Sequence, residues 1–388
     1  MDLSRTTRTV RAGIEADPAH ASVVPPIYLS TNYAFAGLGQ QGAYDYSRAA
    51  NPTRTILAEA LADLEGGAGA VVTASGMAAV TTCLHAFLPE GGTLVVPHDC
   101  YGGSWRLFDA LGRRGHFRLE TLDLTGPDAA ARVAAARPTL LWVETPSNPL
   151  LRLTDLRAVA DAAHRVGALV VADNTFCSPL LQRPLEHGAD AVIHSTTKYL
   201  NGHSDVIGGV VVGATPDLAE RAAWWANCLG VTGPALDAYL TLRGLRTLEV
   251  RMGRHVANAE AVVGALAGHP GLAALHYPGL PDHPDHALCL RQQSAAGAIV
   301  SLEVAGGEPA VRAFLEGLAC FSLAESLGGV ESLVAHPATM THAAMPPDVQ
   351  AAAGITPGLL RLSIGIEDAR DLVADLLAAL DRARAASL

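Results

Sequence analysis

The middle of the chain alternates between short apolar runs and longer stretches with helical spacing. The apolar runs are continuous rather than interrupted by polar residues, which is typical of strands buried on both faces of a parallel sheet. Six such runs occur, at residues 70–73, 93–96, 139–143, 169–172, 191–193 and 209–212. Apolar residues recur every three or four positions over 155–166, which predicts a helix that ends before Gly167. The pattern predicts an α/β domain with helices on both sides of its sheet.

The two ends of the chain have different patterns. Residues 1–48 contain two adjacent prolines, scattered aromatic residues and little periodicity, so we expect an arm that becomes ordered on another surface. After residue 246, helical stretches at 252–266 and 367–385 enclose the alternating runs 298–304 and 359–364, which are typical of antiparallel strands. We therefore predict an N-terminal arm (1–48), an α/β domain (49–245) and an α+β C-terminal domain (246–388).

The composition limits the classes of protein to which the chain can belong. Of the 388 residues, 49% are hydrophobic and 17% charged, as in ordinary globular proteins. The net charge of −11 disfavours nucleic acid or an anionic membrane as a partner. Apolar runs are strand-length, and the N-terminus lacks the apolar core of a signal peptide. We expect a cytoplasmic protein that binds neither membranes nor nucleic acid.

The cysteine and histidine positions give little indication of a metal. The six cysteines are scattered and form no CxxC pair, which disfavours a zinc knuckle or a redox pair and fits reduced thiols. His203, His283 and His286 have no acidic or cysteine partner at helical spacing. We predict no metal site.

Lys198 is the only lysine among the 27 basic Lys and Arg residues. It follows three hydroxyl residues, Ser195, Thr196 and Thr197, which come directly after a predicted strand. An amine can lose its proton and attack a carbonyl, whereas a guanidinium effectively cannot. Two interpretations follow: a lysine that binds an aldehyde cofactor whose phosphate meets the hydroxyls, or a surface lysine on a Ser/Thr turn.

Other polar residues follow predicted strands, at the sheet edge where α/β proteins bind ligands. Gly76 opens a helix whose free amides would receive a phosphate, and Asp173 would pair with a pyridine nitrogen. Tyr101 would stack on the ring, and Asn148 lies in a proline-stiffened loop. Arg361, among apolar neighbours, needs an anion, either a substrate carboxylate or an internal salt bridge. The chain order of these residues fits a pyridoxal-phosphate enzyme.

A dehydrogenase on the same kind of sheet is the alternative from another class. It requires GxGxxG with an acidic residue about 20 positions later. The glycines at 66, 67, 69 and 76 do not match that spacing.

Six segments together carry a family resemblance. They are DYSRAANPTR (45–54), PHDCYGGS (97–104), TPSNP (145–149), VADNT (171–175), HSTTKYLNGH (194–203) and ESLGGVES (325–332). Over essentially its whole length the chain resembles the Cys/Met-metabolism family of pyridoxal-phosphate enzymes. Within it, WWAN (224–227) and GVTG (230–233) are most similar to the bacterial γ-synthases. The resemblance implies the aspartate-aminotransferase-like fold (fold type I), with a large, mostly parallel seven-stranded sheet domain and a smaller C-terminal domain.

The resemblance also implies a role for each site residue. The catalytic residues would be Lys198, which binds the cofactor pyridoxal 5'-phosphate, Asp173 and Tyr101. The cofactor phosphate would be held by Gly76, Met77, Ser195 and Thr197, and by Tyr46 and Arg48 of a neighbouring subunit. The substrate would be bound by Asp45, Arg106, Asn148, Asn227, Glu325, Ser326 and Arg361, with Asn148 also touching the cofactor. The expected assembly is a homotetramer of active-site-sharing dimers that acts on small amino acids.

The resemblance leaves several reactions open. We predict γ-replacement, in which an O-acyl-L-homoserine and L-cysteine give L-cystathionine. The γ-lyases, β-lyases and sulfhydrylases share the fold, and Glu325 argues mainly against a β-lyase because it suits a substrate ammonium group. The uncharged segment 40–43 and Ala49 weaken the case for a succinyl ester and leave the acetyl ester open.

Overall fold

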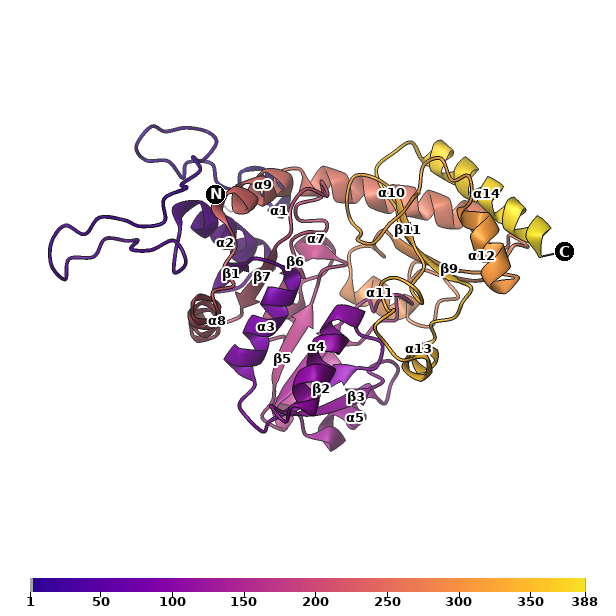
Figure 1. Ribbon diagram of the computed structural model, residues 1–388, viewed down its shortest axis with the longest axis horizontal. Coiled ribbons are helices and arrows are strands. Elements are labelled where there is room, and N and C mark those ends of the chain that lie inside the picture. Colours follow the sequence, from indigo (N-terminus) through magenta and orange to yellow (C-terminus); the bar gives the residue numbers. More distant parts are fainter. Residues whose placement is uncertain (1–2, 388) are drawn as a thin grey trace.

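The computed structural model describes residues 3–387 and contains a large sheet and a small sheet joined by a long helix (Figure 1). The large sheet has seven strands in the order β1-β7-β6-β5-β4-β2-β3. Its strands are β1 (Gly69–Thr73), β2 (Thr93–Pro97), β3 (Arg118–Leu122), β4 (Leu140–Glu144), β5 (Leu169–Asp173), β6 (Ala191–Ser195) and β7 (Gly209–Gly213). All neighbours from β3 to β6 are parallel, and β7 runs antiparallel to β1 and β6. The predicted mostly parallel seven-stranded sheet is confirmed.

The strand β3 is missing from the six apolar runs recognised in the sequence. It lies at the edge of the sheet, where it pairs only with β2, and its five residues RLETL are at best half-buried. An edge strand needs only one partner and one covered face. Its pattern therefore lacks the continuous hydrophobicity of the central strands.

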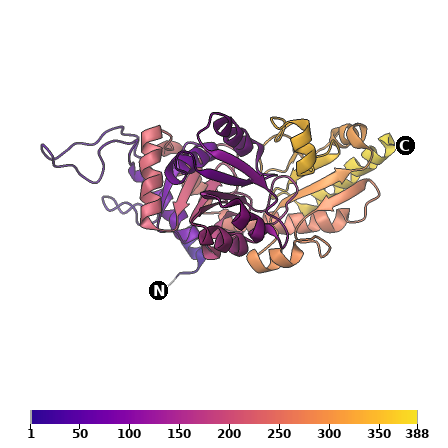
Figure 2. The same cartoon turned by 90° about the horizontal axis from the view of Figure 1, so that it is seen from below.

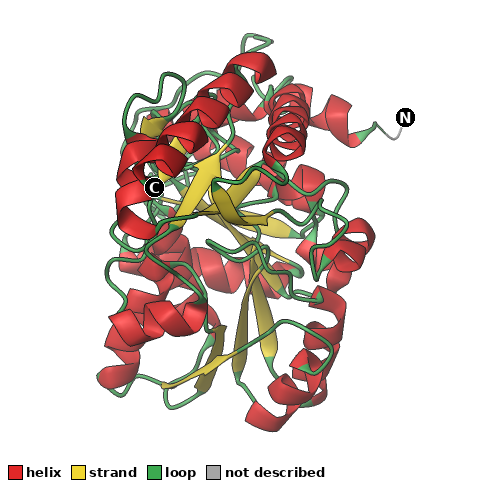
Figure 3. Ribbon diagram, turned by 90° about the vertical axis from the view of Figure 1, so that its right-hand side faces the viewer, coloured by secondary structure: helices red, strands yellow, loops and turns green. Residues whose placement is uncertain are grey.

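Helices cover both faces of the large sheet (Figure 3). One face packs against α3 (Gly76–Phe87), α4 (Gly102–Arg113) and α8 (Pro216–Leu229). The other face packs against α5 (Ala129–Ala136) and α6 (Leu156–Arg165), and near β1 and β7 against α2 (Pro52–Glu65). The predicted helix at 155–166 is α6, and the Asp155 side chain caps it by accepting the Ala158 N–H at 3.1 Å. Both faces of the sheet are therefore buried, as the continuous apolar runs predict.

The C-terminal part forms the small sheet, in the order β10-β11-β12-β9-β8. Its strands are β8 (Leu272–His276), β9 (Ile299–Val304), β10 (Ser322–Leu323), β11 (Leu333–Ala335) and β12 (Leu359–Ser363). The two alternating runs predicted as antiparallel strands are β9 and β12, which pair antiparallel. Its helices are α10 (Leu248–Leu266), α11 (His286–Gln292), α12 (Gly307–Leu315), α13 (Pro347–Ala353) and α14 (Ala369–Ala386).

Two helix boundaries in this part differ from the prediction. Helix α10 begins four residues before 252, and its first turn includes the buried Arg251. The Arg251 guanidinium donates to the carbonyls of Tyr199 and Gly244, so a residue with the hydropathy of a surface position belongs to the core. Helix α14 begins at Ala369 rather than 367 because the Asp368 side chain accepts the Arg370 N–H at its N-cap.

The N-terminal segment consists of two different parts. Its first helix, α1 (Arg5–Val10), packs on α2 of the same chain, with Arg8 and Asp63 in a 2.7 Å ion pair. The segment between α1 and α2 then extends away from the body in long loops (Figures 1 and 2). The predicted arm therefore applies to the part after α1, and its contact with a neighbouring subunit stays a prediction.

Three further helical elements complete the description: α9 (Ala235–Leu245), α7 (Ser178–Leu181) and the 3-10 turn Pro184–His187. Across residues 3–387, no helix combines the length and the apolar character that crossing a membrane requires.

Candidate active site

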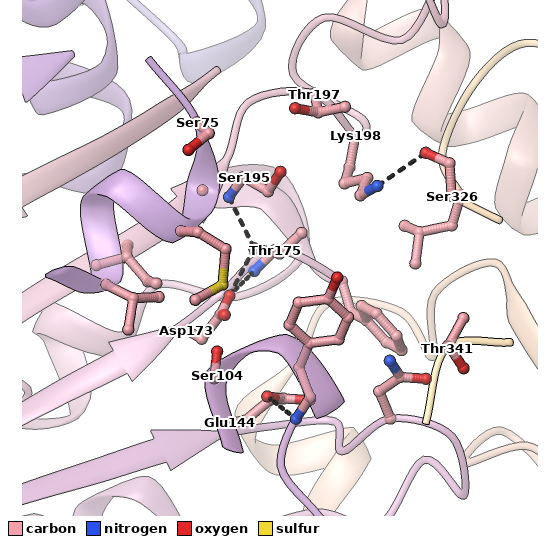
Figure 4. A pocket seen from close by; sticks show the side chains of 18 of the residues that line it. Ser75, Ser104, Glu144, Asp173, Thr175, Ser195, Thr197, Lys198, Ser326 and Thr341 are labelled. Carbon is pink, nitrogen blue, oxygen red and sulfur yellow. Dashed lines mark hydrogen bonds between the residues drawn. The ribbon is translucent and has the colours of Figure 1, made fainter. Parts of the chain in front are cut away.

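A cavity of about 330 Å³ opens at the carboxyl ends of β4, β5 and β6. Loops from the C-terminal part form its opposite wall (Figure 4). Most of the residues singled out in the sequence line it: Gly76, Met77, Tyr101, Asn148, Asp173, Ser195, Thr197, Lys198, Glu325, Ser326 and Arg361. The structure thus brings together residues that are up to 285 positions apart in the chain (361 − 76).

Lys198 lies in the turn after β6, and its amine faces the cavity. The Nζ atom donates a hydrogen bond to Ser326 Oγ at 2.8 Å (Figure 4). Burial, and next the positive charge of Arg361, lower the pKa of Lys198 to about 8, although Glu325 opposes the shift. A substantial fraction of a neutral amine is therefore present in mildly alkaline solution, as attack on a carbonyl requires. The interpretation of Lys198 as a surface residue on a turn is wrong.

Asp173 ends β5 and faces the cavity without a positively charged partner. Its Oδ1 atom accepts hydrogen bonds from the Thr175 N–H at 3.0 Å and the Thr175 hydroxyl at 2.5 Å. In the described part of the chain it forms no ion pair. Burial is the main cause of a raised pKa. A protonated ring nitrogen in the cavity would supply the missing cation, so this carboxyl fits a pyridine cofactor.

The start of α3 forms a site suited to a phosphate. Ser75 caps the helix by accepting the Ala78 N–H at 3.0 Å, and within residues 3–387 the amides of Gly76 and Met77 have no acceptor. A Cβ atom on Gly76 would lie 2.8 Å from Ser195 Cβ, so only glycine lets the two segments approach so closely. Free amides beside the hydroxyls of Ser195 and Thr197 match the phosphate of the expected cofactor.

Arg361 is 2% exposed and has no acidic partner in the described chain. Its Nη1 donates to Asn148 Oδ1 at 3.0 Å and its Nη2 to the Ser326 carbonyl at 2.8 Å, while Nε is buried without a partner. Burial lowers the pKa of Arg361 to about 10, so it stays charged at neutral pH. The internal salt bridge considered for Arg361 is wrong, and the guanidinium can hold a ligand carboxylate.

Tyr101 stands at the start of α4, with its ring at the cavity and 40% exposed. Its backbone N–H donates to Glu144 Oε2 at 2.8 Å, which anchors the loop after β2 to the end of β4. Burial, and next Glu325, raise the pKa of Tyr101. The side chain is therefore a neutral phenol at neutral pH before any ligand binds.

Five predicted site residues do not line the cavity: Asp45, Tyr46, Arg48, Arg106 and Asn227. Arg48 Nε donates to Asn227 Oδ1 at 3.0 Å, and its guanidinium lies 5.4 Å from the centroid of the Tyr46 ring. Asp45 Oδ1 accepts the Tyr46 N–H, and Arg106 is exposed on α4. Their contribution to the cavity of a neighbouring subunit or to substrate binding stays a prediction.

The structure adds lining residues that sequence reasoning missed: Ser75, Ser104, Glu144, Thr175, Phe176 and Thr341. Glu144 and Thr175 stand at or just after strand ends, the same signal that identified Asp173 and Asn148. Thr341 lies in a loop between β11 and β12 and carries no such signal. No group of three or more metal-ligating side chains occurs in the described residues.

The fold and the cavity define a pyridoxal-phosphate enzyme of fold type I. The profile of the family "Cys/Met metabolism PLP-dependent enzyme" matches residues 6–381, and the chain belongs to this family. Its cofactor is pyridoxal phosphate, which the carboxyl of Asp173, the amides of α3 and the Lys198 amine fit.

The relatives carry out several related reactions. The chain is 53% identical to cystathionine gamma-synthase of Escherichia coli (strain K12), with 97% of each chain covered. It is 45% identical to cystathionine beta-lyase of Coxiella burnetii, over 96% of this chain and 97% of the relative. The crystal structure of cystathionine gamma synthase from Xanthomonas oryzae pv. oryzae in complex with cystathionine covers both chains fully, with 59% identity and a TM-score of 0.98. These similarities establish an enzyme of cystathionine metabolism.

Proposed function

We propose that the enzyme is a cystathionine γ-synthase, which joins an O-acyl-L-homoserine to L-cysteine. The observation that carries this proposal is the presence of two oppositely charged groups, Arg361 and Glu325, around one lysine in one cavity. Arg361 suits the carboxylate of the first amino acid, and Glu325 suits the ammonium group of a second one. The identity to the gamma-synthases of E. coli and Xanthomonas supports the same assignment.

The chain holds the first substrate by its α-carboxylate. The free Nε and the Nη groups of Arg361 donate to this carboxylate, and Asn148, oriented by its 3.0 Å bond to Arg361, donates beside them. His342 Nε2 lies 3.0 Å from the Asn148 carbonyl and keeps the loop in place. This arrangement orients the α-carbon toward the lysine.

Lys198 moves the protons. Bound pyridoxal phosphate supplies an electron sink for negative charge at the α-carbon of the substrate. The neutral Nζ of Lys198 would take the α-proton, give that proton up again, and only then take a β-proton, with Ser326 Oγ orienting the amine between the two positions. Asp173 keeps the ring nitrogen protonated.

The replacement itself exchanges one bond for another at the γ-carbon. The Cγ–O bond breaks and the carboxylate of the acyl group leaves, and the sulfur of cysteine then forms the Cγ–S bond. The thiol proton is lost to solvent, since the raised pKa of Tyr101 keeps its phenol protonated, and Lys198 returns protons to the β- and α-carbons. Glu325 holds the cysteine ammonium during this step.

A cystathionine γ-lyase or a sulfhydrylase is the second candidate. The same cavity suits elimination from cystathionine, and the chain is 41% identical to cystathionine gamma-lyase of Bacillus subtilis (strain 168). Product analysis separates the reactions. We expect cystathionine from O-succinyl- or O-acetyl-homoserine only when cysteine is present, and slow release of an oxo acid and ammonia without it. Faster breakdown of cystathionine than synthesis would overturn the synthase assignment.

We further propose a cytoplasmic homotetramer built from active-site-sharing dimers, acting in methionine biosynthesis. The exposed apolar side chains of the arm, including Leu29 and Phe35, support burial against another subunit. The six cysteines of the chain are free thiols, which supports a reducing compartment. Sedimentation of the holoenzyme tests the assembly.

A further inference from the structure

Two carboxyl groups stand side by side on the floor of the cavity. Glu144 ends β4 and Asp173 ends β5, and the two residues are direct partners in the parallel register. Their side chains therefore leave the sheet on the same face, and both line the cavity (Figure 4). Two neighbouring carboxylates repel each other, so one of the pair must hold a proton or meet a cation.

The two carboxyl groups have different surroundings. Asp173 is partly exposed to the cavity, where the cofactor binds. Glu144 is only 6% exposed, and its Oε2 atom accepts the Tyr101 N–H at 2.8 Å. Among residues 3–387, no Lys, Arg or His lies within ion-pair distance of Glu144. A protonated Glu144 would still accept this hydrogen bond through its carbonyl oxygen, whereas an ionised one would be a buried charge without an ion-pair partner.

Most of the groups that face Glu144 do not favour its negative charge. They are Asp173 of β5 and Asp99, Cys100 and Tyr101 between β2 and α4, whereas Arg361 of β12 is the cation among the groups that face it. Burial, then Asp173 and, more weakly, Asp99 raise the pKa of Glu144, and the backbone N–H groups of Tyr101 and Asn148 only partly oppose the shift. The pKa stays well above its usual range.

We propose that Glu144 is a positioning residue that works as a neutral acid. It holds its proton on Oε1, tethers the Tyr101 backbone through Oε2, and leaves the charge beside the cofactor ring to Asp173. The inference rests on the proposed role of Asp173, but it does not depend on which ester or thiol the enzyme uses.

Two substitutions separate the tether from the charge. Glu144→Gln keeps a neutral group with an acceptor oxygen, so its cofactor dissociation constant should stay within about twofold of wild type. Glu144→Ala leaves the Tyr101 N–H without an acceptor and should weaken cofactor binding about tenfold. Glu120→Gln, on the edge strand β3 of the same sheet, is the matched control and should leave the cofactor dissociation constant unchanged.

Infrared difference spectra of the holoenzymes detect the proton on the Glu144 carboxyl group directly. The carbonyl stretch of a protonated carboxylic acid should be present at neutral pH in wild type and in Glu120→Gln, and missing in Glu144→Gln. If Glu144→Gln removes no such band, or binds cofactor as weakly as Glu144→Ala, the proposal is wrong. If Glu144→Ala does not fold, the cofactor dissociation constant and the infrared spectrum of Glu144→Gln test the proposal without it. Asp173→Asn separately tests the role of Asp173: unchanged cofactor affinity there would overturn that role, while the band would still report on Glu144.

Discussion

Lys198 Nζ donates a hydrogen bond to Ser326 Oγ at 2.8 Å, and this contact joins the large sheet domain to the C-terminal part at the centre of the cavity. Ser326 has a φ of 94°, an unusual backbone conformation for a residue other than glycine. Its carbonyl accepts from Arg361 at 2.8 Å, so one residue links the amine to the guanidinium. The amine of Lys198 and the guanidinium of Arg361 are thus both held by Ser326.

Replacement of Lys198 by alanine should abolish the chemistry. We expect turnover to fall by about 10³-fold or more, because the only amine that can move the α-proton is removed. The absorbance of the covalently bound cofactor should also disappear. Since Lys198 is the only lysine in the chain, borohydride reduction of the wild-type holoenzyme should label a single peptide in a mass spectrum. Retention of the same absorbance in the variant would contradict the assignment.

Uptake of cofactor by the apoenzyme should depend on pH through Lys198. The pKa of about 8 means that the neutral, nucleophilic amine becomes more abundant as pH rises. The uptake rate should therefore increase from pH 7 and level off above the pKa, and stopped-flow absorbance measures it. A rate that falls over this range would contradict the assigned ionisation.

Arg361→Ala should raise the KM for the acyl-homoserine. Loss of a charge-assisted hydrogen bond to the α-carboxylate costs about 1.5–3 kcal/mol, or roughly 10- to 100-fold in KM. Arg361→Lys should restore only part of this loss, because an ammonium cannot reproduce the forked geometry that meets Asn148 and the ligand. Full rescue by lysine would indicate that charge alone matters.

Arg48→Ala should weaken cofactor binding about tenfold in the assembled protein, if Arg48 reaches the phosphate of a neighbouring subunit. Within its own chain Arg48 contacts Asn227, so Asn227→Ala is the matched control. Equilibrium dialysis measures the cofactor affinity of both variants. It distinguishes an effect on the phosphate of a neighbouring subunit from an effect on the Arg48–Asn227 contact inside the chain. Equal weakening by both substitutions would show that the effect runs through the contact inside the chain.

Glu325→Ala should raise the KM for cysteine more than the KM for the acyl-homoserine. The side chain is exposed at the cavity, so we expect a loss of about 1 kcal/mol, or roughly fivefold. Glu325→Gln should show most of the same effect because the ammonium contact depends on charge. Steady-state kinetics with each substrate varied in turn make the comparison, and equal changes in both KM values would remove the proposed role.

Much of the fold could be predicted because the signals are local. The central strands are buried on both faces, so their continuous apolar runs identify them individually, and α6 is recognisable from its apolar stripe and its cap. The edge strand β3 and the first turn of α10 could not be found in this way. The strand β3 mixes charged and apolar residues, and the first turn of α10 contains Arg251, whose burial is explained only by the carbonyls that it meets in space.

Candidates for the chemistry of the site could also be proposed from local patterns. A single lysine after a strand, a glycine before a helix and an aspartate at a strand end indicate a reactive amine, a phosphate site and a ring partner, and these roles stay predictions. The candidates follow from residue type and position along the chain, and the family resemblance then implied a role for each. They need no knowledge of distant contacts, because the carboxyl ends of parallel strands always meet at one edge.

Tertiary structure alone decided how these groups influence one another. The pKa of Lys198 depends on burial and on Arg361, which comes from another sheet, and the coupling of Glu144 to Asp173 depends on the register of β4 with β5. Likewise, only the folded chain shows that Arg48 and its partner Asn227 lie outside the cavity of their own chain. Charge interactions and desolvation act over a few ångströms in space regardless of separation along the chain, and no local pattern records which residues will be neighbours.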